Sequence, residues 1–449
     1  MRPLFELEKT AINVDWNVLK IKRVLDTPIT DGPHETPELL DEGIPFLSAE
    51  SVKKGKIDFN LKRGYISRED HEKYIKKCKP QRDDIFMIKS GATTGNVAMV
   101  ETDEEFSIWS PLALIRADKE IIQPKYLYYF IGSAAFREQV EISWSFGTQQ
   151  NIGMKVIENL FISIPPLHLQ EKLVHYIEKK VVQIDKLIEM KELNIKLLEQ
   201  QRQSIITEAV TKGLNPNVKM KDSGVEWIGE IPEHWSILAL KHIASEKKHS
   251  FVDGPFGSDL KNEEYVDSGV PVIQLNNIKN GDLRVINMNF VTKKKSEQLK
   301  RHIAYPGDLV IAKMASPIAR SAVVPKTYEN YVIVADCIKL KLKENYLNHY
   351  INFAMNTPFT IAQAESFANG TTRSRVNLSI IKNLKLPIPN FEEQKEIASY
   401  LTLKVSEVNN VIKAVENQIQ KLKEYRQSLI YEAVTGKIDV RDMELDEVR

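Results

Sequence analysis

Residues 202–211 read RQSIITEAVT, and residues 426–435 read RQSLIYEAVT, an offset of 224 (426 − 202). At the same offset upstream, NLFISIP at 159–165 recurs as NLKLPIP at 383–389. Self-similarity at a fixed period indicates a supersecondary unit that occurs more than once. The sequence therefore predicts two tandem copies of one unit.

The copies agree far better in their second halves than in their first halves. Upstream matches survive with small shifts, as Gly43-Ile44-Pro45 against Gly269-Val270-Pro271 and Asp84 against Asp308 show. Each unit is thus predicted to be a variable module followed by a constant helical segment. The predicted parts are a first module (1–165), a first spacer helix (166–213), a linker (214–236), a second module (237–389), a second spacer helix (390–436) and a polar tail (437–449).

Both constant segments carry apolar residues spaced alternately by four and three, which is the heptad pattern of a coiled-coil seam. Pro165 and Pro389 precede the predicted helices, and Gly213 and Gly436 follow them as C-terminal stops. A narrow seam requires one partner helix, and each copy supplies the other's partner. The seam alone leaves parallel and antiparallel pairing open. Its predicted members are Ile177, Val181, Ile184, Ile188, Ile195 and Leu198, with Leu401, Val405, Val408, Ile412, Val415, Ile419 and Leu422 at the same register.

The modules are predicted to be α/β (α+β) domains with many short strands. Residues 84–88 and 96–100 favour a strand pair around a turn-rich segment, and residues 308–312 and 321–324 form its counterpart. A helix is expected near 125–140 in the first module and near 346–362 in the second.

Composition indicates a globular protein of the reducing cytosol. Apolar residues make up 42% of the 449 residues and charged residues 27%, and no stretch approaches the length of a membrane span. Cys78 and Cys337 are the two cysteines, so neither a disulfide framework nor a zinc site is expected. With 62 basic and 61 acidic residues, any basic surface must be local. Candidate basic clusters are Lys53, Lys54 and Lys56; Lys73, Lys76, Lys77, Lys79 and Arg82; and Lys293, Lys294, Lys295, Lys300 and Arg301.

Catalytic motifs do not emerge from the sequence. GATTG at 91–95 lacks the Lys-Ser/Thr of a phosphate-binding loop, and no glycine-rich cofactor fingerprint follows a strand. IPPL at 164–167 has the wrong flanks for an amino-methyltransferase signature. Glu189-Met190-Lys191 resembles part of a nuclease triad but sits on the predicted helix without an upstream carboxylate. We therefore expect a protein that is not an enzyme and binds no metal or cofactor itself.

The segment DSGVEWIGEIPEHW at 222–235 resembles the linker of type I restriction-modification specificity subunits. DGPHETP from Asp31, DGPFGSDL from Asp253, the IPxxxxQ entries at Pro165 and Pro389, and the RQSxIxEAVT helix ends add to this resemblance, which spans nearly the whole chain. It implies two target-recognition domains that each read half of a bipartite, asymmetric DNA sequence, held apart by an antiparallel helical spacer. It also implies modification subunits docked on the helices and restriction subunits joining that complex. S-adenosylmethionine, ATP and magnesium would belong to those partners.

Candidate DNA-binding residues follow from the rule that bases are read by hydrogen-bonding side chains on loops, while lysine and arginine bind phosphates. In the first module they are Asp31, Gly32, His34, Lys89, Ser90, Thr93, Thr94, Thr148, Gln149 and Gln150. In the second module they are Asp253, Phe256, Ser258, Lys300, Arg301, Lys313, Arg320, Thr371, Thr372, Arg373 and Arg375. The DG pairs at 31–32 and 253–254 also suit tight turns, so a structural role for them stays open.

Two other functions remain to be distinguished. A coiled-coil adaptor that joins protein partners would show no salt-sensitive binding to duplex DNA. A self-sufficient nuclease or methyltransferase would show turnover with this chain alone.

Overall fold

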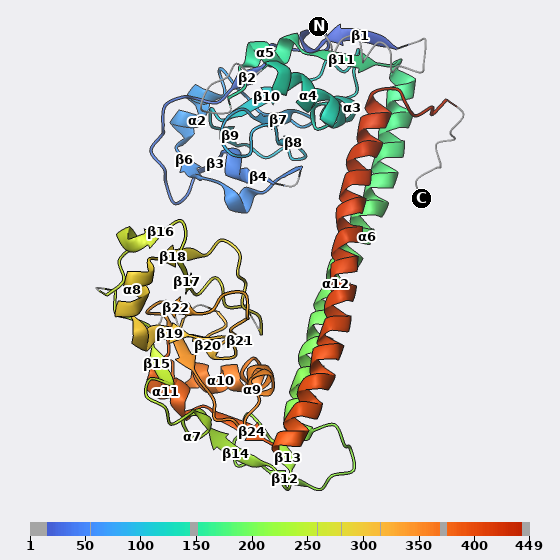
Figure 1. Ribbon diagram of the computed structural model, residues 1–449. Coiled ribbons are helices and arrows are strands. Elements are labelled where there is room, and N and C mark those ends of the chain that lie inside the picture. The colour runs from blue at the N-terminus through green and yellow to red at the C-terminus, as the bar shows by residue number, and fades with distance from the viewer. Residues whose placement is uncertain are drawn as a thin grey trace. The chain divides into compact units, whose positions relative to one another are not determined.

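The computed structural model describes residues 16–53, 55–143, 151–257, 259–279, 281–314, 316–368 and 375–441 (Figure 1). The chain divides into two compact units. Unit 1 consists of residues 1–192 and 417–449, and unit 2 consists of residues 193–416. Each unit therefore combines one module with parts of both long helices.

Unit 1 is built on two small sheets. The first has the strand order β2-β10-β7-β8 with antiparallel neighbours, and the second has the order β6-β3-β9, in which β3 and β9 are parallel. Two further pairs, β1-β11 and β4-β5, complete the unit. The strands are β1 (Asn17–Lys20), β2 (Thr30–Asp31), β3 (Ile44–Leu47), β4 (Val52–Lys53), β5 (Lys56–Ile57), β6 (Gly64–Ile66), β7 (Ile85–Ile88), β8 (Val97–Met99), β9 (Ser107–Ile108), β10 (Leu112–Ile115) and β11 (Phe161–Ile164).

The helix expected near 125–140 is two helices, α3 and α4. Gly132 and Ser133 separate them, and the Ser133 hydroxyl donates to the Phe130 carbonyl at 2.6 Å. Glycine and serine both disfavour a helix interior, so the prediction of one helix was wrong. The helices of the module are η1 (Ile21–Arg23), η2 (Ala49–Ser51), η3 (Phe59–Leu61), α2 (Arg68–Tyr74), α3 (Pro124–Ile131), α4 (Ala134–Ser143) and α5 (Met154–Asn159).

Unit 2 repeats this plan. Its sheet β15-β23-β20-β21 matches β2-β10-β7-β8, and its five-stranded sheet β16-β18-β17-β22-β19 contains the counterparts of β6-β3-β9. The strands are β12 (Met220–Asp222), β13 (Glu230–Pro232), β14 (Ser236–Ala239), β15 (Phe251–Asp253), β16 (Tyr265–Val266), β17 (Val270–Ile273), β18 (Asn289–Val291), β19 (Ile303–Ala304), β20 (Leu309–Ala312), β21 (Ser321–Val323), β22 (Tyr331–Ile333), β23 (Cys337–Leu340) and β24 (Lys385–Ile388).

The second predicted module helix, near 346–362, is likewise two helices. Pro358 begins the second of them, and proline has no N–H to continue the preceding turn. The predicted strand pairs are confirmed as β7-β8 and β20-β21. The helices of the second module are α7 (Leu240–Ile243), η4 (Asn262–Glu264), α8 (Lys293–Gln298), η5 (Lys300–His302), α9 (Asn348–Met355), α10 (Pro358–Ser366) and α11 (Leu378–Asn383).

The two long helices are α6 (Leu167–Lys212) and α12 (Phe391–Val434), and they pair in an antiparallel coiled coil. In unit 1, Arg426 of α12 forms an ion pair with Asp185 of α6 at 3.0 Å, and Lys191 donates to Gln418 at 2.6 Å. In unit 2, Arg202 donates to Asn409. All predicted seam residues are buried or half-buried.

The ends of the long helices follow the expected signals. Gly213 and Gly436 both have φ of 77°, the left-handed conformation that favours glycine after a helix. Asn390 precedes α12, and its side chain accepts from the Glu393 amide at 3.0 Å. That hydrogen bond satisfies one of the free amides at the helix start.

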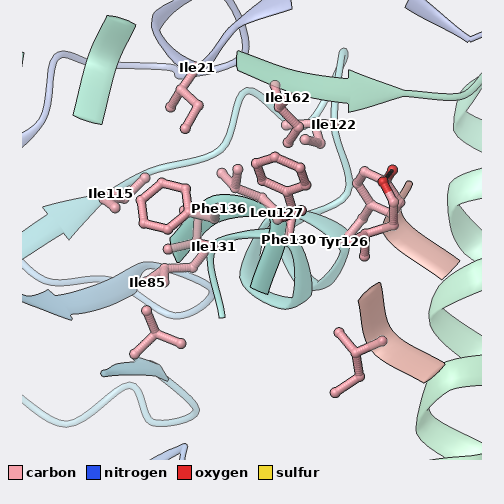
Figure 2. Packing of buried hydrophobic residues seen from close by; sticks show 14 of the residues in the cluster. Ile21, Ile85, Ile115, Ile122, Tyr126, Leu127, Phe130, Ile131, Phe136 and Ile162 are labelled. Carbon is pink, nitrogen blue, oxygen red and sulfur yellow. Dashed lines mark hydrogen bonds between the residues drawn. The ribbon is translucent and has the colours of Figure 1, made fainter. Parts of the chain in front are cut away.

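Each module packs its hydrophobic core against the long helices of its own unit. Figure 2 shows this core in unit 1, where side chains from α3 meet Ile85, Ile115 and Ile162 from three strands. The buried Tyr126 hydroxyl donates to the carbonyls of Ser163 and Val434. In unit 2, Tyr350 bonds Pro387 and Val210 in the same way. A repeated tyrosine thus ties each module to the end of a long helix.

Residues 214–236, the predicted linker, form an ordered part of unit 2. They contain the hairpin β12-β13 and end at the fully buried Trp235, which packs beside Gly213. None of the helices among the described residues has the length and apolar character needed to cross a membrane.

Candidate nucleic-acid interface

Lys89 lies where three segments of the first module meet. It follows β7, its amide donates to the Pro111 carbonyl at 2.8 Å, and its carbonyl accepts from the Ile152 amide at 2.9 Å. Lys89 therefore joins the end of β7 to the loop after β9 and to the segment around Ile152. Loops held this way on a sheet are where binding residues are usually found.

Asp31 forms ion pairs with Lys89 and with Lys77. Its carboxylate accepts from Lys89 Nζ at 2.5 Å and from Lys77 Nζ at 2.5 Å, and its side chain is 1% exposed. Burial alone would raise the pKa of this carboxyl, but the two lysines outweigh burial and hold the pKa below its ordinary value. We call Asp31, Lys77 and Lys89 the first lysine cluster.

The second module builds the same arrangement around Lys313. The Lys313 amide donates to the Asp336 backbone carbonyl, and the Lys313 carbonyl accepts from the Val376 amide. Lys313 Nζ lies 3.5 Å from the Asp253 carboxylate and donates to the Ala335 carbonyl. Asp253 and Lys313 form the second lysine cluster. The second cluster is looser than the first, because the Asp253 side chain is 37% exposed and meets one lysine among the described residues.

The glycine of each DGP motif is required by close packing. A Cβ at Gly32 would lie 1.8 Å from the Ile108 carbonyl oxygen, and a Cβ at Gly254 would lie 1.8 Å from that of Val334. No side chain fits at such distances, so both loops approach the neighbouring strand end in the same way. The glycine of each motif therefore has a role in packing, and contact of the motif with DNA stays a prediction.

Several predicted DNA-binding residues therefore lie together. In the first module, Asp31, Gly32, His34, Lys89 and Ser90 gather at the first lysine cluster, since His34 Nε2 lies 3.4 Å from Asp31 and Ser90 pairs with Asn151. Thr93 and Thr94 lie in the turn between β7 and β8, Thr93 exposed and Thr94 half-buried. Their contacts with DNA stay predictions.

In the second module, Asp253, Lys313 and Arg375 lie together, because Arg375 forms an ion pair with Asp336 at 2.8 Å and pairs with Met314. Phe256, 82% exposed, follows the Asp253 turn. Lys300 and Arg301 are exposed on η5. The remaining predicted residues Thr148, Gln149, Gln150, Ser258, Thr371, Thr372 and Arg373 fall outside the described residues.

Arg320 differs from the other candidates because it is buried. Its Nε donates to the Ile278 carbonyl, and its Nη atoms donate to the carbonyls of Leu275 and Pro317, all between 2.8 and 2.9 Å. These bonds brace the loop after β20. Sequence composition cannot distinguish such an arginine from one that faces a ligand.

Some residues of the basic runs seen in the sequence pair with carboxylates. Lys73 pairs with Glu35, Arg82 with Asp103, and Lys295 with Glu264. Lys77 was not predicted to join Asp31, since 46 residues separate them and only the fold brings them together. Among the described residues, no three side chains are grouped to hold a metal ion.

Residues 13–200 and 257–421 match the family model for the type I restriction modification DNA specificity domain. The chain belongs to this family. The type I restriction enzyme MjaVIII specificity subunit of Methanocaldococcus jannaschii is 21% identical and covers 98% of this chain and 96% of its own length. The EcoBI specificity subunit of Escherichia coli is 20% identical over 331 residues, 71% of this chain and 67% of that protein.

A solved chain from a study of complex assembly and conformational transition of the type I R-M system has the same fold. Its TM-score is 0.66 at 15% identity, and the match covers 95% of this chain and 99% of that one. The specificity family resemblance seen in the sequence is thus confirmed. Membership of a DNA specificity family favours DNA recognition over the coiled-coil adaptor.

Proposed function

We propose that the chain is the DNA sequence-recognition subunit of a type I restriction-modification complex, and that each module reads one half of a bipartite, asymmetric target. The observation that carries this proposal is the duplicated lysine cluster. The same loops converge on Lys89 and on Lys313, each at the end of the corresponding strand. One chain with two equivalent sites fits two separate contacts with one duplex.

Different side chains at matched positions support unlike half-sites. His34 and Phe256 occupy the same step after the DGP motif, and Trp109 and Val334 occupy the same step after β9 and β22. Backbone geometry is shared, whereas the groups offered to a ligand differ. Base identity is read by such groups, so the halves of the target would differ in sequence.

The long helices are proposed to dock two modification subunits, which restriction subunits then join. Exposed apolar residues on the helices support a docking role, because large apolar side chains in water favour burial by a partner. On α6 these are Val182, Leu187 and Met190 in unit 1 and Leu193 and Leu197 in unit 2; on α12 they include Leu403 and Val411 in unit 2.

We further propose that the chain has no catalytic activity of its own. S-adenosylmethionine, ATP and magnesium would be bound by the partner subunits. The first lysine cluster holds two lysines against one carboxylate, and its excess positive charge suits the positioning of a DNA phosphate.

Genome-wide mapping of methylated bases with and without this gene tests the proposal. We expect a bipartite motif with two unlike halves that disappears on deletion and returns when the full-length gene is restored. Restoration by a variant carrying Lys89→Ala and Lys313→Ala should be incomplete. A contiguous motif, or a methylation pattern that deletion leaves unchanged, would contradict the proposal.

A further inference from the structure

Arg63 lies over the ring of Trp109 in the first module. Its guanidinium carbon is 3.8 Å from the centre of the indole ring. The Arg63 amide donates to the Phe46 carbonyl and the Trp109 amide donates to the Leu47 carbonyl, both at 2.9 Å. Consecutive residues of β3 thus anchor the two partners, and the stack is fixed by the sheet rather than by a flexible loop.

The stack adjoins the first lysine cluster. Trp109 lies in the segment that packs on Gly32, and the next residue, Ser110, donates its amide to the Pro33 carbonyl at 3.2 Å. The residue after that, Pro111, accepts from the Lys89 amide. Arg63 therefore stands beside the DGP loop and the end of β7, where the predicted DNA-binding residues of this module gather.

Arg63 is exposed and makes no ion pair within the described ranges. Two basic residues of the following helix α2 differ, since Arg68 pairs with Glu105 and Lys73 with Glu35. A guanidinium that stacks on an aromatic face keeps the N–H donors along its edge for another partner. A planar, fixed fork of donors matches the O6 and N7 acceptors of guanine.

Trp109 contributes its ring face to this arrangement. Its Nε1 is buried without a hydrogen-bond partner among the described residues. A buried, unsatisfied N–H is unfavourable, and a smaller apolar residue would avoid it. The ring is therefore placed for what its face does, which is to hold Arg63.

The described residues of the second module form no such stack. The Val334 amide donates to the Ile273 carbonyl as the Trp109 amide donates to the Leu47 carbonyl, so the aliphatic Val334 stands at the position of Trp109. Gly43 and Gly269 approach the carbonyls of Ile66 and Val291 in the same way, which places Met288 at the position of Arg63. Met288 is buried, so no donor is presented there.

We infer that Arg63, held on Trp109, contacts the O6 and N7 atoms of a guanine in the half-site read by the first module, and that the second module makes no equivalent contact. This inference rests on the proposed function and adds one specificity-determining residue to it. A fixed base contact, unlike a phosphate contact, needs the planar fork and not merely the charge.

The test is selection of bound duplexes from a randomised pool by the full-length chain in complex with its modification subunits. We compare wild type with Arg63→Ala, Arg63→Lys and Trp109→Ala, with Arg68→Ala as the matched surface control. Arg63→Ala and Arg63→Lys should both lower the preference for guanine at one position by roughly 5- to 150-fold. The other half-site, and the Arg68→Ala selection, should be unchanged.

Trp109→Ala should lower the same preference, and Trp109→Phe should retain most of it because an aromatic face remains. Equal loss for all sequences with rescue by Arg63→Lys would identify a phosphate contact and overturn the inference. A motif that the Arg63 and Trp109 variants leave unchanged would also overturn the inference. If the wild-type complex enriches no bipartite sequence, the proposed function itself fails, which is a different result from an unaltered motif in the variants.

Discussion

Asp31 and Asp253 occupy the same step of the repeat but hold their lysines differently. Asp31 is fully enclosed and bonds two lysines at 2.5 Å, whereas Asp253 lies 3.5 Å from one lysine. One Asp253 oxygen is buried without a hydrogen-bond partner among the described residues. The first lysine cluster is thus a closed ion-pair network, and the second retains unused hydrogen-bonding capacity near its surface.

Asp31→Asn should destabilise the protein by about 3 kcal/mol at neutral pH, because it leaves two lysines beside a neutral, buried amide. Asp253→Asn is the matched control and should cost less than about 1 kcal/mol, since its carboxylate is partly solvated. Chemical denaturation of both variants and wild type measures the difference. Equal losses in the two variants would contradict a closed first cluster and an open second one.

The Asp31 contribution should depend on pH in a defined direction. The lysines depress the folded-state pKa of Asp31 below its unfolded value of about 4. A depressed carboxyl pKa stabilises the fold fully above the unfolded pKa and loses that effect as pH falls through the folded pKa. The stability gap between wild type and Asp31→Asn should therefore narrow below about pH 4, and a gap that widens in acid would refute the pairing.

Lys300→Ala should weaken binding to every duplex sequence alike, because we predict that this exposed lysine on η5 contacts phosphate. The slope of log affinity against log salt concentration should fall by about 1. Binding titrations at several salt concentrations measure this, with Lys404→Ala on α12 as the control. A change in sequence preference without a change in salt slope would show that Lys300 reads bases.

Residue-level roles were the hardest to predict from sequence. The DGP motifs and the turn after β7 were recognised as candidates, and the fold brings Asp31, Lys89 and Ser90 together. Lys77 and the Arg63–Trp109 stack were missed, because their partners are distant in sequence and no local pattern links them. Arg320 is the opposite case, because its residue type suits DNA binding but its guanidinium donates to backbone carbonyls of its own module.

At the scale of elements, the heptad seam predicted that α6 and α12 pair, but it left their direction open. Arg202 and Arg426, which follow the seam residues Leu198 and Leu422 by four positions, give a physical reason for the antiparallel direction. A parallel pair in the repeat register would place Arg202 beside Arg426, two like charges, whereas the antiparallel pair sets Arg426 against Asp185 and Arg202 against Asn409. Polar residues at seam positions are known to specify such pairing. This signal was present in the sequence.

Leu401 and Leu403 allow a sharp test of the seam. Leu401 is fully buried and Leu403 is 59% exposed on the same helix. Leu401→Ala should lower the free energy of unfolding by about 2–5 kcal/mol through a core cavity, and Leu403→Ala should change it by less than about 0.5 kcal/mol. Denaturant titration of the full-length chain measures both. Comparable losses in the two variants would argue against the seam.

The module helices could be predicted in place but not in number. The apolar periodicity near 125–140 and 346–362 is real, and buried residues of α3, α4, α9 and α10 account for it. The breaks at Ser133 and Pro358 have local causes, because glycine and serine disfavour a helix interior and proline lacks the N–H that continues a helix. The apolar periodicity runs across both breaks, so periodicity alone predicts one helix in each module.

At the scale of the whole molecule, the chain consists of two units, each with its own core, its own module and its own lysine cluster. The constant features of the repeat hold the fold, as the tyrosines Tyr126 and Tyr350 and the glutamines Gln170 and Gln394 do through backbone hydrogen bonds. Residues that differ between the modules, such as His34 and Phe256, lie around the two lysine clusters. Such a division lets one module change its sequence preference without disturbing the other.

The claim that one chain carries two equivalent recognition modules is tested most directly by a base-by-base substitution scan of the target duplex with the complete complex. We expect two blocks of sensitive base pairs separated by insensitive ones. Combined Thr93→Ala and Thr94→Ala should relax one block, and Arg375→Ala should relax the other. A single continuous block, or one variant that relaxes both blocks, would contradict the claim that the modules read two separate half-sites.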